Sequence, residues 1–322
     1  MSRIGCARAC APGTAMTTEA LAAPRGEGAL LGRLAAGRLL PITVVSAAIL
    51  VIWYLGAVWL NAPLQIDAFE RQKVEWSTED LVRATLAQER PLLPAPHQIL
   101  VEMKKTILDK KITSKRSLVF HAWVTLSSTL LGFAIGTALG VLLATGIVHL
   151  QTLDKSLMPW VISSQTIPIL AIAPMIVVVL GAVGLKGLVP KAIISTYLCF
   201  FPVTIGMVKG LRSPDLLQLD LMRTYCASGW QTFWKLRWPS SMPFLFASLK
   251  VAIAISLVGA IVGELPTGAQ AGLGARLLVG SYYGQTIQIW SALITAAILA
   301  ACMVALVGVG ERVVLRRMGI KL

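Results

Sequence analysis

Long apolar blocks separated by short charged segments make up most of this chain. Stretches without any Asp, Glu, Lys or Arg cover residues 39–66, 117–153, 156–185, 192–208, 251–263 and 277–310. A helix needs about 20 mostly apolar residues to cross the hydrocarbon layer of a bilayer, which is about 30 Å thick. The pattern predicts six membrane-spanning helices, near 41–60, 121–148, 159–181, 189–209, 244–264 and 288–310. Lys250 falls inside the fifth, so we expect it to face protein or water rather than lipid.

Composition supports the same interpretation. Of the 322 residues, 56% are hydrophobic and 14% are charged, and the mean hydropathy is +0.74. A soluble domain has roughly 25% charged residues. We therefore expect an all-α fold, a polytopic membrane helix bundle, and we exclude a soluble globular protein.

The distribution of charge predicts which side each loop faces. With both termini in the cytoplasm, the cytoplasmic segments total +10 and the external segments +4, which together give the net charge of +14. Positive residues concentrate on the cytoplasmic side of membrane proteins. This predicts a multi-pass membrane protein with both termini inside. Six basic residues between Lys104 and Arg116 oppose the rule, because they fall on the external side.

The segments between the predicted spans suggest a domain organisation. Residues 1–37 form a mobile cytoplasmic leader, in which Met16 is a second candidate start. Residues 38–118 hold the first span, a polar insert at 61–90 and an amphipathic helix over 97–113. Residues 119–312 form the main membrane domain with a cytoplasmic loop at 210–240, and 313–322 form a basic tail. The five cysteines predict no disulfide framework, because two lie in the leader and two in spans.

Small residues and prolines distinguish the second and third spans. Gly132, Gly136 and Gly140 recur at every fourth position of the second, which predicts a flat strip for close packing of a neighbouring helix. The third contains three prolines, which free backbone carbonyls that only protein or a water-lined cavity can satisfy. This span is therefore expected to border a pathway or a hinge. The candidate pathway-lining residues are Gln165, Thr166, Pro168, Tyr197, Ser256 and Glu264, and hydrogen bonding between helices is the alternative role for Gln165, Thr166, Tyr197 and Ser256.

The cytoplasmic loop has the composition of a docking surface. It opens at Arg212-Ser213-Pro214-Asp215, which is a helix start, and Asp220 is expected to favour that start through the helix dipole. A small-residue corner follows, and then an aromatic and basic stretch that Pro239 closes. Aromatic residues and arginines anchor protein interfaces. The candidate docking residues are Asp220, Cys226, Ala227, Ser228, Gly229, Trp230, Phe233, Trp234 and Pro239. A helix lying on the bilayer is the alternative.

The same loop resembles the EAA loop of ABC importer permeases, in which E-A-A is followed after three residues by Gly and after nine more by I-x-L-P. Here Asp220-Leu221-Met222, Cys226 and Leu236-Arg237-Trp238-Pro239 keep the spacing, although only the proline keeps its identity. Four other segments resemble the nitrate, sulfonate and taurine permeases of this family in the same order. They are Leu93-Pro94-Ala95-Pro96, the run from Gln165 to Pro174, Phe200-Phe201-Pro202 with Gly210-Leu211-Arg212, and Glu264 followed by Gly272-Leu273-Gly274.

The resemblance covers about residues 92–312 and leaves out the insert at 61–90. It implies a type I ABC importer permease fold and a transport subunit that forms the pathway for a small solute. It also implies an ATPase subunit in two copies docked on the loops, a second permease subunit in a homodimer, and a soluble solute-binding protein outside. The chain contains no Gly-Lys dipeptide and so no G-x-x-x-x-G-K-[ST] phosphate loop. We therefore expect no cofactor, no metal, no nucleic-acid partner and no enzyme activity in this chain, with ATP used by the partner.

Two other classes are considered. A gradient-driven transporter or channel would bury ionisable residues at mid-membrane, whereas Lys191, Glu264 and Glu311 fall near span ends. A membrane enzyme would need paired acids or clustered histidines, and His97, His121 and His149 are scattered. The sequence leaves open whether the solute is a nitrate-, sulfonate- or taurine-like anion or a pyrimidine-type heterocycle, and whether the dimer is homomeric.

Overall fold

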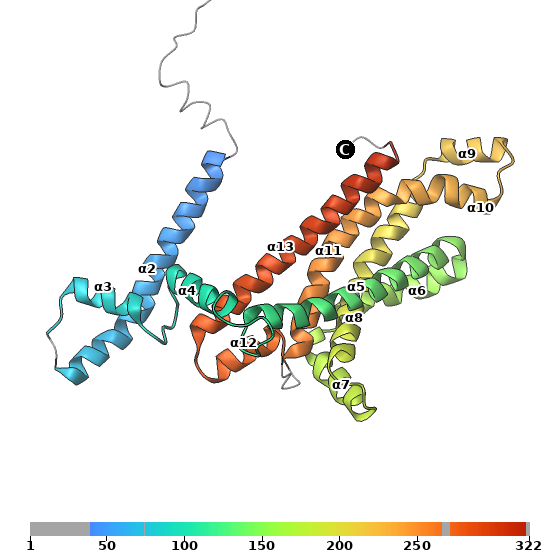
Figure 1. The fold of residues 1–322 in the computed structure, drawn as a ribbon. Coiled ribbons are helices and arrows are strands. Elements are labelled where there is room, and N and C mark those ends of the chain that lie inside the picture. Colours follow the sequence, from blue (N-terminus) through green and yellow to red (C-terminus); the bar gives the residue numbers. More distant parts are fainter. Residues whose placement is uncertain (1–38, 74, 266–270, 320–322) are drawn as a thin grey trace, which may run out of the picture. The chain divides into compact units, whose positions relative to one another are not determined.

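The computed structural model describes residues 39–73, 75–265 and 271–319, and the regular elements within these ranges are all helices (Figure 1). The predicted leader at 1–37 and the last residues of the predicted tail lie outside them. The elements are α2 (Leu39–Gln72), α3 (Thr78–Ala87), α4 (Pro96–Ile107), α5 (Leu118–His149), α6 (Gln151–Ser163), the 3₁₀ turn η1 (Ser164–Thr166), α7 (Ile169–Ala182), α8 (Leu188–Leu211), α9 (Leu216–Thr224), α10 (Gly229–Thr232), the π turn η2 (Phe233–Arg237), α11 (Trp238–Glu264), α12 (Leu273–Tyr282) and α13 (Thr286–Arg317).

The chain divides into two units at Ile52, within α2. In the first unit the described part of α2 exposes nearly all of its apolar side chains, as a lipid-facing helix does; Ile42 and Val44, for example, are each 59% exposed. The second unit begins at Trp53 and contains the rest of α2 and all the remaining helices. The predicted amphipathic helix over 97–113 is shorter than expected, because α4 ends at Ile107.

The predicted membrane spans each correspond to a long apolar helix or, in one case, to a bent pair of helices. Within the described ranges, five helical segments are long and apolar enough to cross a membrane, and a sixth span results if the bent pair α6 and α7 is counted as one. Four of the predicted spans correspond to α5, α8, α11 and α13. The first corresponds to α2, which continues past the predicted end at residue 60 as far as Gln72.

The third predicted span requires a correction, since residues 159–181 do not form a continuous helix. The segments Gln151–Thr166 and Ile169–Ala182 meet at an angle of 99°. Pro168 causes the break, because a proline forces the preceding residue out of the helical region, and Ile167 has φ −78° and ψ 120°. Pro159 and Pro174 lie inside α6 and α7 without ending them.

Glycines on α5 allow it to pack closely against α8, as their spacing predicted. A Cβ atom added at Gly132 would lie 2.4 Å from Ser195 Cβ, and one added at Gly136 would lie 2.8 Å from Cys199 Cβ. Gly140 meets α8 one turn further on. Helices in lipid associate through such van der Waals contact, because apolar burial alone gives little advantage there. The α5–α8 pair is therefore a fixed part of the bundle.

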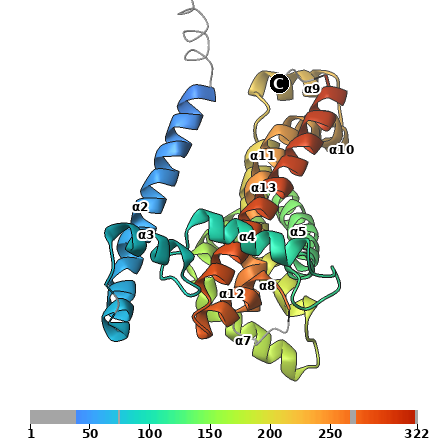
Figure 2. The ribbon, with the colours of Figure 1, turned by 60° about the vertical axis from the view of Figure 1, so that its left-hand side comes forward.

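The other face of α8 packs against α11 in the same way. A Cβ atom at Gly206 would lie 2.5 Å from Ser248 Cβ, and one at Gly259 would lie 3.0 Å from Ser195 Cα. Helix α11 also contacts α13, where Lys250 forms an ion pair with Glu311. Lys250 thus faces protein, as expected. Helices α5, α8, α11 and α13 form the core of the second unit (Figures 1 and 2).

The two ends of this helical core carry different elements. One end holds α9 and α10 together with the C-terminal ends of α5, α8 and α13, and the other end holds α12 with the start of α13 (Figures 1 and 2). At the latter end the segment 91–96 is fixed by side chains of α2. Asn61 accepts a hydrogen bond from Leu92 N at 2.7 Å, and Trp53 Nε1 donates to Pro94 O at 3.1 Å.

Candidate functional site

The loop predicted at 210–240 folds into two short helices joined by a sharp corner. Asp215 precedes α9, and its N–H donates to Gln218 Oε1, which confirms the predicted helix start. Cys226 ends α9 with a positive φ of 50°, while Ala227 N donates to Met222 O at 3.0 Å. This is the Schellman arrangement, in which glycine is the usual residue at the left-handed position. The geometry gives a physical reason for the glycine that the EAA pattern has where this chain has Cys226.

The corner itself is formed as predicted by Ala227, Ser228 and Gly229. The Ser228 hydroxyl accepts from Gln231 N at 3.3 Å, and Ser228 N donates to Gln231 Oε1 at 3.0 Å, so the two residues cap α10. A Cβ atom at Gly229 would meet nothing within 4 Å. The expectation for Asp220 was wrong, however. It lies in the middle of α9 and pairs with Arg223 at 3.0 Å, so the helix start depends on Asp215.

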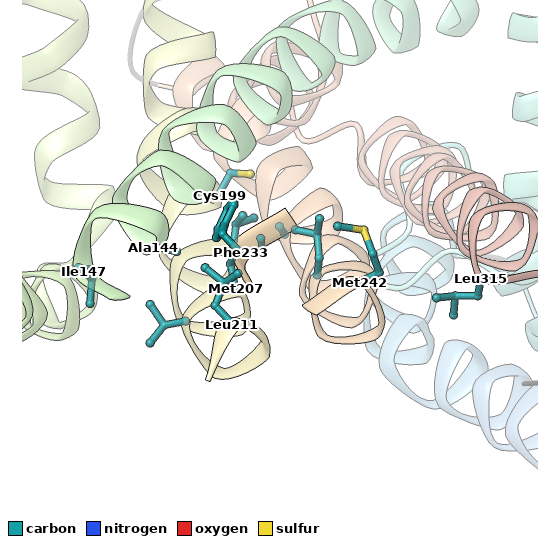
Figure 3. Close-up of a cluster of buried hydrophobic side chains, with 12 residues drawn as sticks. Ala144, Ile147, Cys199, Met207, Leu211, Phe233, Met242 and Leu315 are labelled. Carbon is teal, nitrogen blue, oxygen red and sulfur yellow. The ribbon is translucent and has the colours of Figure 1, made fainter. Parts of the chain in front are cut away.

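Phe233 was predicted to be a docking residue, but the structure gives it a different position. Its side chain is only 7% exposed and belongs to a buried cluster with Ile147, Met207 and Leu315 (Figure 3). The ring of His149, at the end of α5, lies against it with a centroid separation of 5.2 Å. Phe233 therefore anchors the loop in the bundle and is not free to enter a partner.

The exposed side of the loop is apolar. Trp230 is 71% exposed and Trp234 is 45% exposed, and the centroids of their rings are 5.6 Å apart. Helix α9 has no buried residue, and together with Tyr225, which follows it, the helix adds four large side chains that are between 56% and 82% exposed, namely Leu216, Leu217, Leu221 and Tyr225. We call these six residues the loop face. Contiguous exposed apolar patches mark interaction sites.

The sequence predicted that Pro239 closes the loop, but in the structure it does not. Residues 229–264 form one continuous helical segment, in which α10 and η2 lead directly into α11. Trp238 N donates to Phe233 O, five residues earlier in the chain, and this wider spacing of the hydrogen bond is that of a π turn. A proline in an α-helix clashes with the carbonyl group four residues earlier, and a local π turn relieves such strain. The loop is thereby joined rigidly to the fifth span.

A second candidate site lies at the break between η1 and α7. The structure brings together four of the predicted pathway residues there: Gln165, Thr166 and Pro168 are exposed, and Tyr197 reaches the break from α8. The Tyr197 hydroxyl donates to Ser164 O at 2.6 Å. Irregular backbone at membrane depth is tolerated only against protein or water. Within a membrane span, such a break would therefore need protein or water beside it.

The remaining two predicted pathway residues are buried within the subunit, so the expectation that they line a pathway needs correction. Ser256 is fully buried, and its hydroxyl donates to Thr129 O at 3.2 Å and lies 2.6 Å from Ser195 Oγ. Glu264 is also fully buried. Both side chains bond to neighbouring helices, which for Ser256 is the alternative role that the sequence allowed.

Glu264 lies at the centre of a buried polar network at the end of the bundle opposite the loop. Its carboxylate accepts hydrogen bonds from Gly274 N at 2.7 Å, Thr125 Oγ1 at 3.0 Å and Lys191 Nζ at 3.2 Å. The network joins α5, α8 and α11 to the first turn of α12. A Cβ atom at Gly272 would lie only 2.1 Å from the Glu264 carboxyl carbon. A glycine is therefore needed beside this carboxylate.

Two further members of the network were missed in the sequence. Thr125 Oγ1 accepts from Leu273 N at 2.9 Å, and His121 Nδ1 accepts from Gly272 N at 3.0 Å. His121 Nε2 donates to Lys115 O at 2.9 Å, so its partners fit the neutral ring. The signal for this network in the sequence was a single acidic residue at the end of an apolar block, followed by two closely spaced glycines. This polar cluster is structural, and no cluster with the geometry of a metal site was found among residues 39–73, 75–265 and 271–319.

Comparison with known proteins identifies the family. Residues 136–320, which include the break, the loop face and Glu264, match the model of binding-protein-dependent transport system inner membrane components. The chain belongs to this family. It is 31% identical over 194 residues to the formylaminopyrimidine transport permease ThiX of Halalkalibacterium halodurans, covering 60% of this chain and 72% of that one.

Two other relatives extend the comparison to different solutes. The riboflavin transport permease RibX of Chloroflexus aurantiacus is 31% identical over 196 residues, covering 61% of this chain and 71% of its own. The nitrate import permease NrtB of Synechocystis is 25% identical over 224 residues, covering 67% and 75%. The chain is thus a permease subunit of an ABC importer, with an ATPase and a solute-binding protein as partners, as the resemblance implied. Nothing favours the gradient-driven alternative.

Proposed function

We propose that this permease forms a homodimer that imports a small solute, with two separate ATPase subunits docked on the loop faces. The observation that carries the proposal is the loop face itself, because six large apolar side chains are exposed outside the spans. A buried interface anchor that is truncated to alanine typically costs at least about 2 kcal/mol of binding free energy. Trp230 is the strongest candidate anchor, since it is large and 71% exposed.

The way in which the loop is held supports a coupling role. Phe233 lies within the buried cluster of the bundle, and Arg212 at the end of α8 pairs with Asp154 on α6 at 2.8 Å. A force applied to Trp230 is therefore transmitted to several spans at once. ATP-driven movement of the ATPase subunits would in this way reorient the bundle rather than bend the loop.

The break in the third span is proposed to line the pathway. It exposes Gln165 and Thr166 at a site where lipid is excluded on physical grounds, so a second subunit or water must cover it. The Tyr197 hydroxyl holds the end of η1 against α8, the helix that leads to the loop. Movement of the loop and the shape of the break would be linked through α8.

The charge of the break favours one class of solute. No charged residue lies between Lys155 and Lys186, so the exposed polar groups at the break are uncharged. An anion in a low-dielectric pathway without a counter-charge is unfavourable. Because the run from Gln165 to Pro174 also resembles that of anion permeases, similarity to heterocycle permeases has to decide, and we favour a neutral polar heterocycle such as a pyrimidine over a nitrate-, sulfonate- or taurine-like anion. ThiX and RibX, both named for heterocycles, are more similar to this chain than NrtB.

The remaining parts of the proposal concern orientation and energy. The loop and both termini would face the cytoplasm, as the distribution of charge predicts. The permease would hold no cofactor and no metal of its own, and ATP would be bound and hydrolysed by the partner. The lack of a Gly-Lys dipeptide supports this, because a phosphate loop of the Walker type needs one.

The test compares two aromatic residues three positions apart. Tagged permease is purified from membranes that also contain its ATPase, and the ATPase activity of the purified material is measured. Trp230→Ala should reduce the co-purified ATPase at least about tenfold and leave the melting temperature of the permease unchanged. Phe233→Ala should instead lower the melting temperature, because emptying a buried phenylalanine site costs about 3–5 kcal/mol.

A third variant serves as a control. Trp123 is 66% exposed on α5, away from the loop, so Trp123→Ala should leave ATPase recovery unchanged. Equal recovery of ATPase from the wild type and Trp230→Ala would refute the docking role. Impaired membrane insertion with normal ATPase recovery would instead support a loop that lies on the bilayer.

A further inference from the structure

The segment that joins α4 to α5 lies at the boundary of a membrane span. Met103 and Ile107 of α4 pack against Leu118, the first residue of α5, in a buried cluster. The segment between them ends at Ser117, immediately before the span. A chain that enters a span within one or two residues is at the level of the lipid headgroups, whichever side of the membrane it faces.

This segment carries an unusual density of positive charge. Six basic residues, two in the last turn of α4 and four in the segment itself, are called the basic collar; they are Lys104, Lys105, Lys110, Lys111, Lys115 and Arg116. Five of them are exposed, and within the part of the chain that the structure describes none forms an ion pair.

Acidic residues nearby do not neutralise the collar. Only Glu102 and Asp109 lie in or next to it. Glu102 acts on Arg276 of α12: burial lowers the pKa of Arg276, and the negative charge of Glu102 opposes that shift. Six cations and two carboxylates between Glu102 and Arg116 still leave this stretch with a net charge of +4.

Large apolar side chains lie just before the basic residues and between them. Leu100, Val101, Leu108 and Ile112 are each between 65% and 70% exposed. A connector in water has no physical reason to expose four such residues within 13 positions. Alternation of lysine with exposed aliphatic side chains is typical of segments that insert their apolar groups into a bilayer surface and hold their cations at the phosphates.

We propose that the basic collar is a binding surface for anionic phospholipid headgroups, in the leaflet on the side opposite the loop face. The exposed aliphatic side chains enter the acyl region and the lysines contact the phosphates. This occupant explains why six basic residues oppose the general distribution of charge, because lipid holds them at the membrane surface. The collar lies outside residues 136–320 that match the family, so this inference is independent of the transported solute and of ATPase docking.

The experiment uses the full-length permease in nanodiscs of phosphatidylcholine. Photoactivatable phosphatidylglycerol or photoactivatable phosphatidylcholine is included at the same low fraction, and lipid adducts are located by peptide mapping. In the wild type, peptides of the collar should carry several-fold more phosphatidylglycerol than phosphatidylcholine. Raising the salt concentration should reduce this preference, because ionic screening weakens exposed charges.

Two variants with equal charge changes test the location. The collar variant neutralises four exposed lysines, Lys104→Gln, Lys105→Gln, Lys111→Gln and Lys115→Gln. The control variant neutralises four exposed cations of the insert, Arg71→Gln, Lys73→Gln, Arg83→Gln and Arg90→Gln. Each cation near an anionic surface contributes about fivefold in binding at low salt. The preference for phosphatidylglycerol should therefore fall at least about tenfold in the collar variant and stay unchanged in the control variant.

Labelling near Arg316 and Arg317, at the other end of the bundle, gives an internal reference that should not change in either variant. The proposal is overturned if the collar variant keeps its preference, if both variants lose it equally, or if glycerol 3-phosphate displaces the lipid. It is also overturned if lipid labelling persists while the collar variant loses binding of a purified acidic solute-binding protein. If the collar variant is poorly folded, the salt dependence of the wild type still decides, since a preference that salt does not change contradicts headgroup binding.

Discussion

Replacement of Glu264 by glutamine tests the buried network directly. The change keeps the shape of the side chain but removes its charge, which leaves the ammonium group of Lys191 buried, 8% exposed, without a counter-charge. It also places an amide NH₂ group where the carboxylate accepts from Gly274 N and Thr125 Oγ1. Removal of one partner of a buried ion pair typically costs about 3–5 kcal/mol. We expect Glu264→Gln to destabilise the permease by an amount in this range.

The measurement is thermal unfolding of the purified permease in detergent, monitored by fluorescence-detection size-exclusion chromatography. A loss of this size should lower the melting temperature on the order of 10 °C. The matched control is Glu79→Gln, which removes the partner of Arg83 from an exposed pair on α3 with side chains 79% and 74% exposed. Exposed pairs contribute little to stability, so this control should melt within about 1 °C of the wild type.

A second variant separates the charge pair from general damage to the bundle. In the double variant Lys191→Met with Glu264→Gln no unpaired charge remains, and part of the lost stability should return. The coupling between the two sites should exceed about 1 kcal/mol, since residues in contact within one network are not additive. A melting temperature of Glu264→Gln equal to that of the wild type, or strictly additive losses, would refute the reasoning.

Three further substitutions have defined outcomes. Cys226→Gly should stabilise the permease by about 1 kcal/mol, seen as a higher melting temperature, because φ of 50° strains a residue with a side chain. Tyr197→Phe removes the bond to the break and should cost about 0.6 kcal/mol of stability, yet lower the solute imported per ATP hydrolysed. Gly136→Val should cost at least about 1–3 kcal/mol through its clash with Cys199, whereas Gly181→Val, with open space around it, should melt like the wild type.

The spans could be predicted from sequence because their signal is local. Twenty apolar residues satisfy the bilayer whatever their neighbours are, so the boundaries of α5, α8 and α13 follow from composition alone. The break in the third span did not follow in the same way. Pro159, Pro168 and Pro174 give the same signal in the sequence, but only Pro168 separates two helices. Which proline breaks a helix depends on what the neighbouring spans can satisfy.

The loop shows a similar division. Its corner and its helix start were predicted because Ser228 and Asp215 act on backbone groups within a few residues. The separate positions of Trp230 and Phe233 were not predicted. Both are aromatic and lie on one short helical stretch, and the end of α5, where His149 lies, decides which of them is buried. No local pattern contains that information.

The charged residues show why the pathway itself was only partly predicted. The sequence placed Glu264 among the candidate pathway residues. Its partners Lys191 and Thr125 lie 73 and 139 positions away in the sequence, so the pairing that satisfies it is invisible locally. With Glu264 paired in the interior, the candidate pathway residues that stay exposed are uncharged ones at the break, among them Gln165 and Thr166. In this bundle the buried charges join helices, and the proposal that the solute meets neutral polar groups rests on the break.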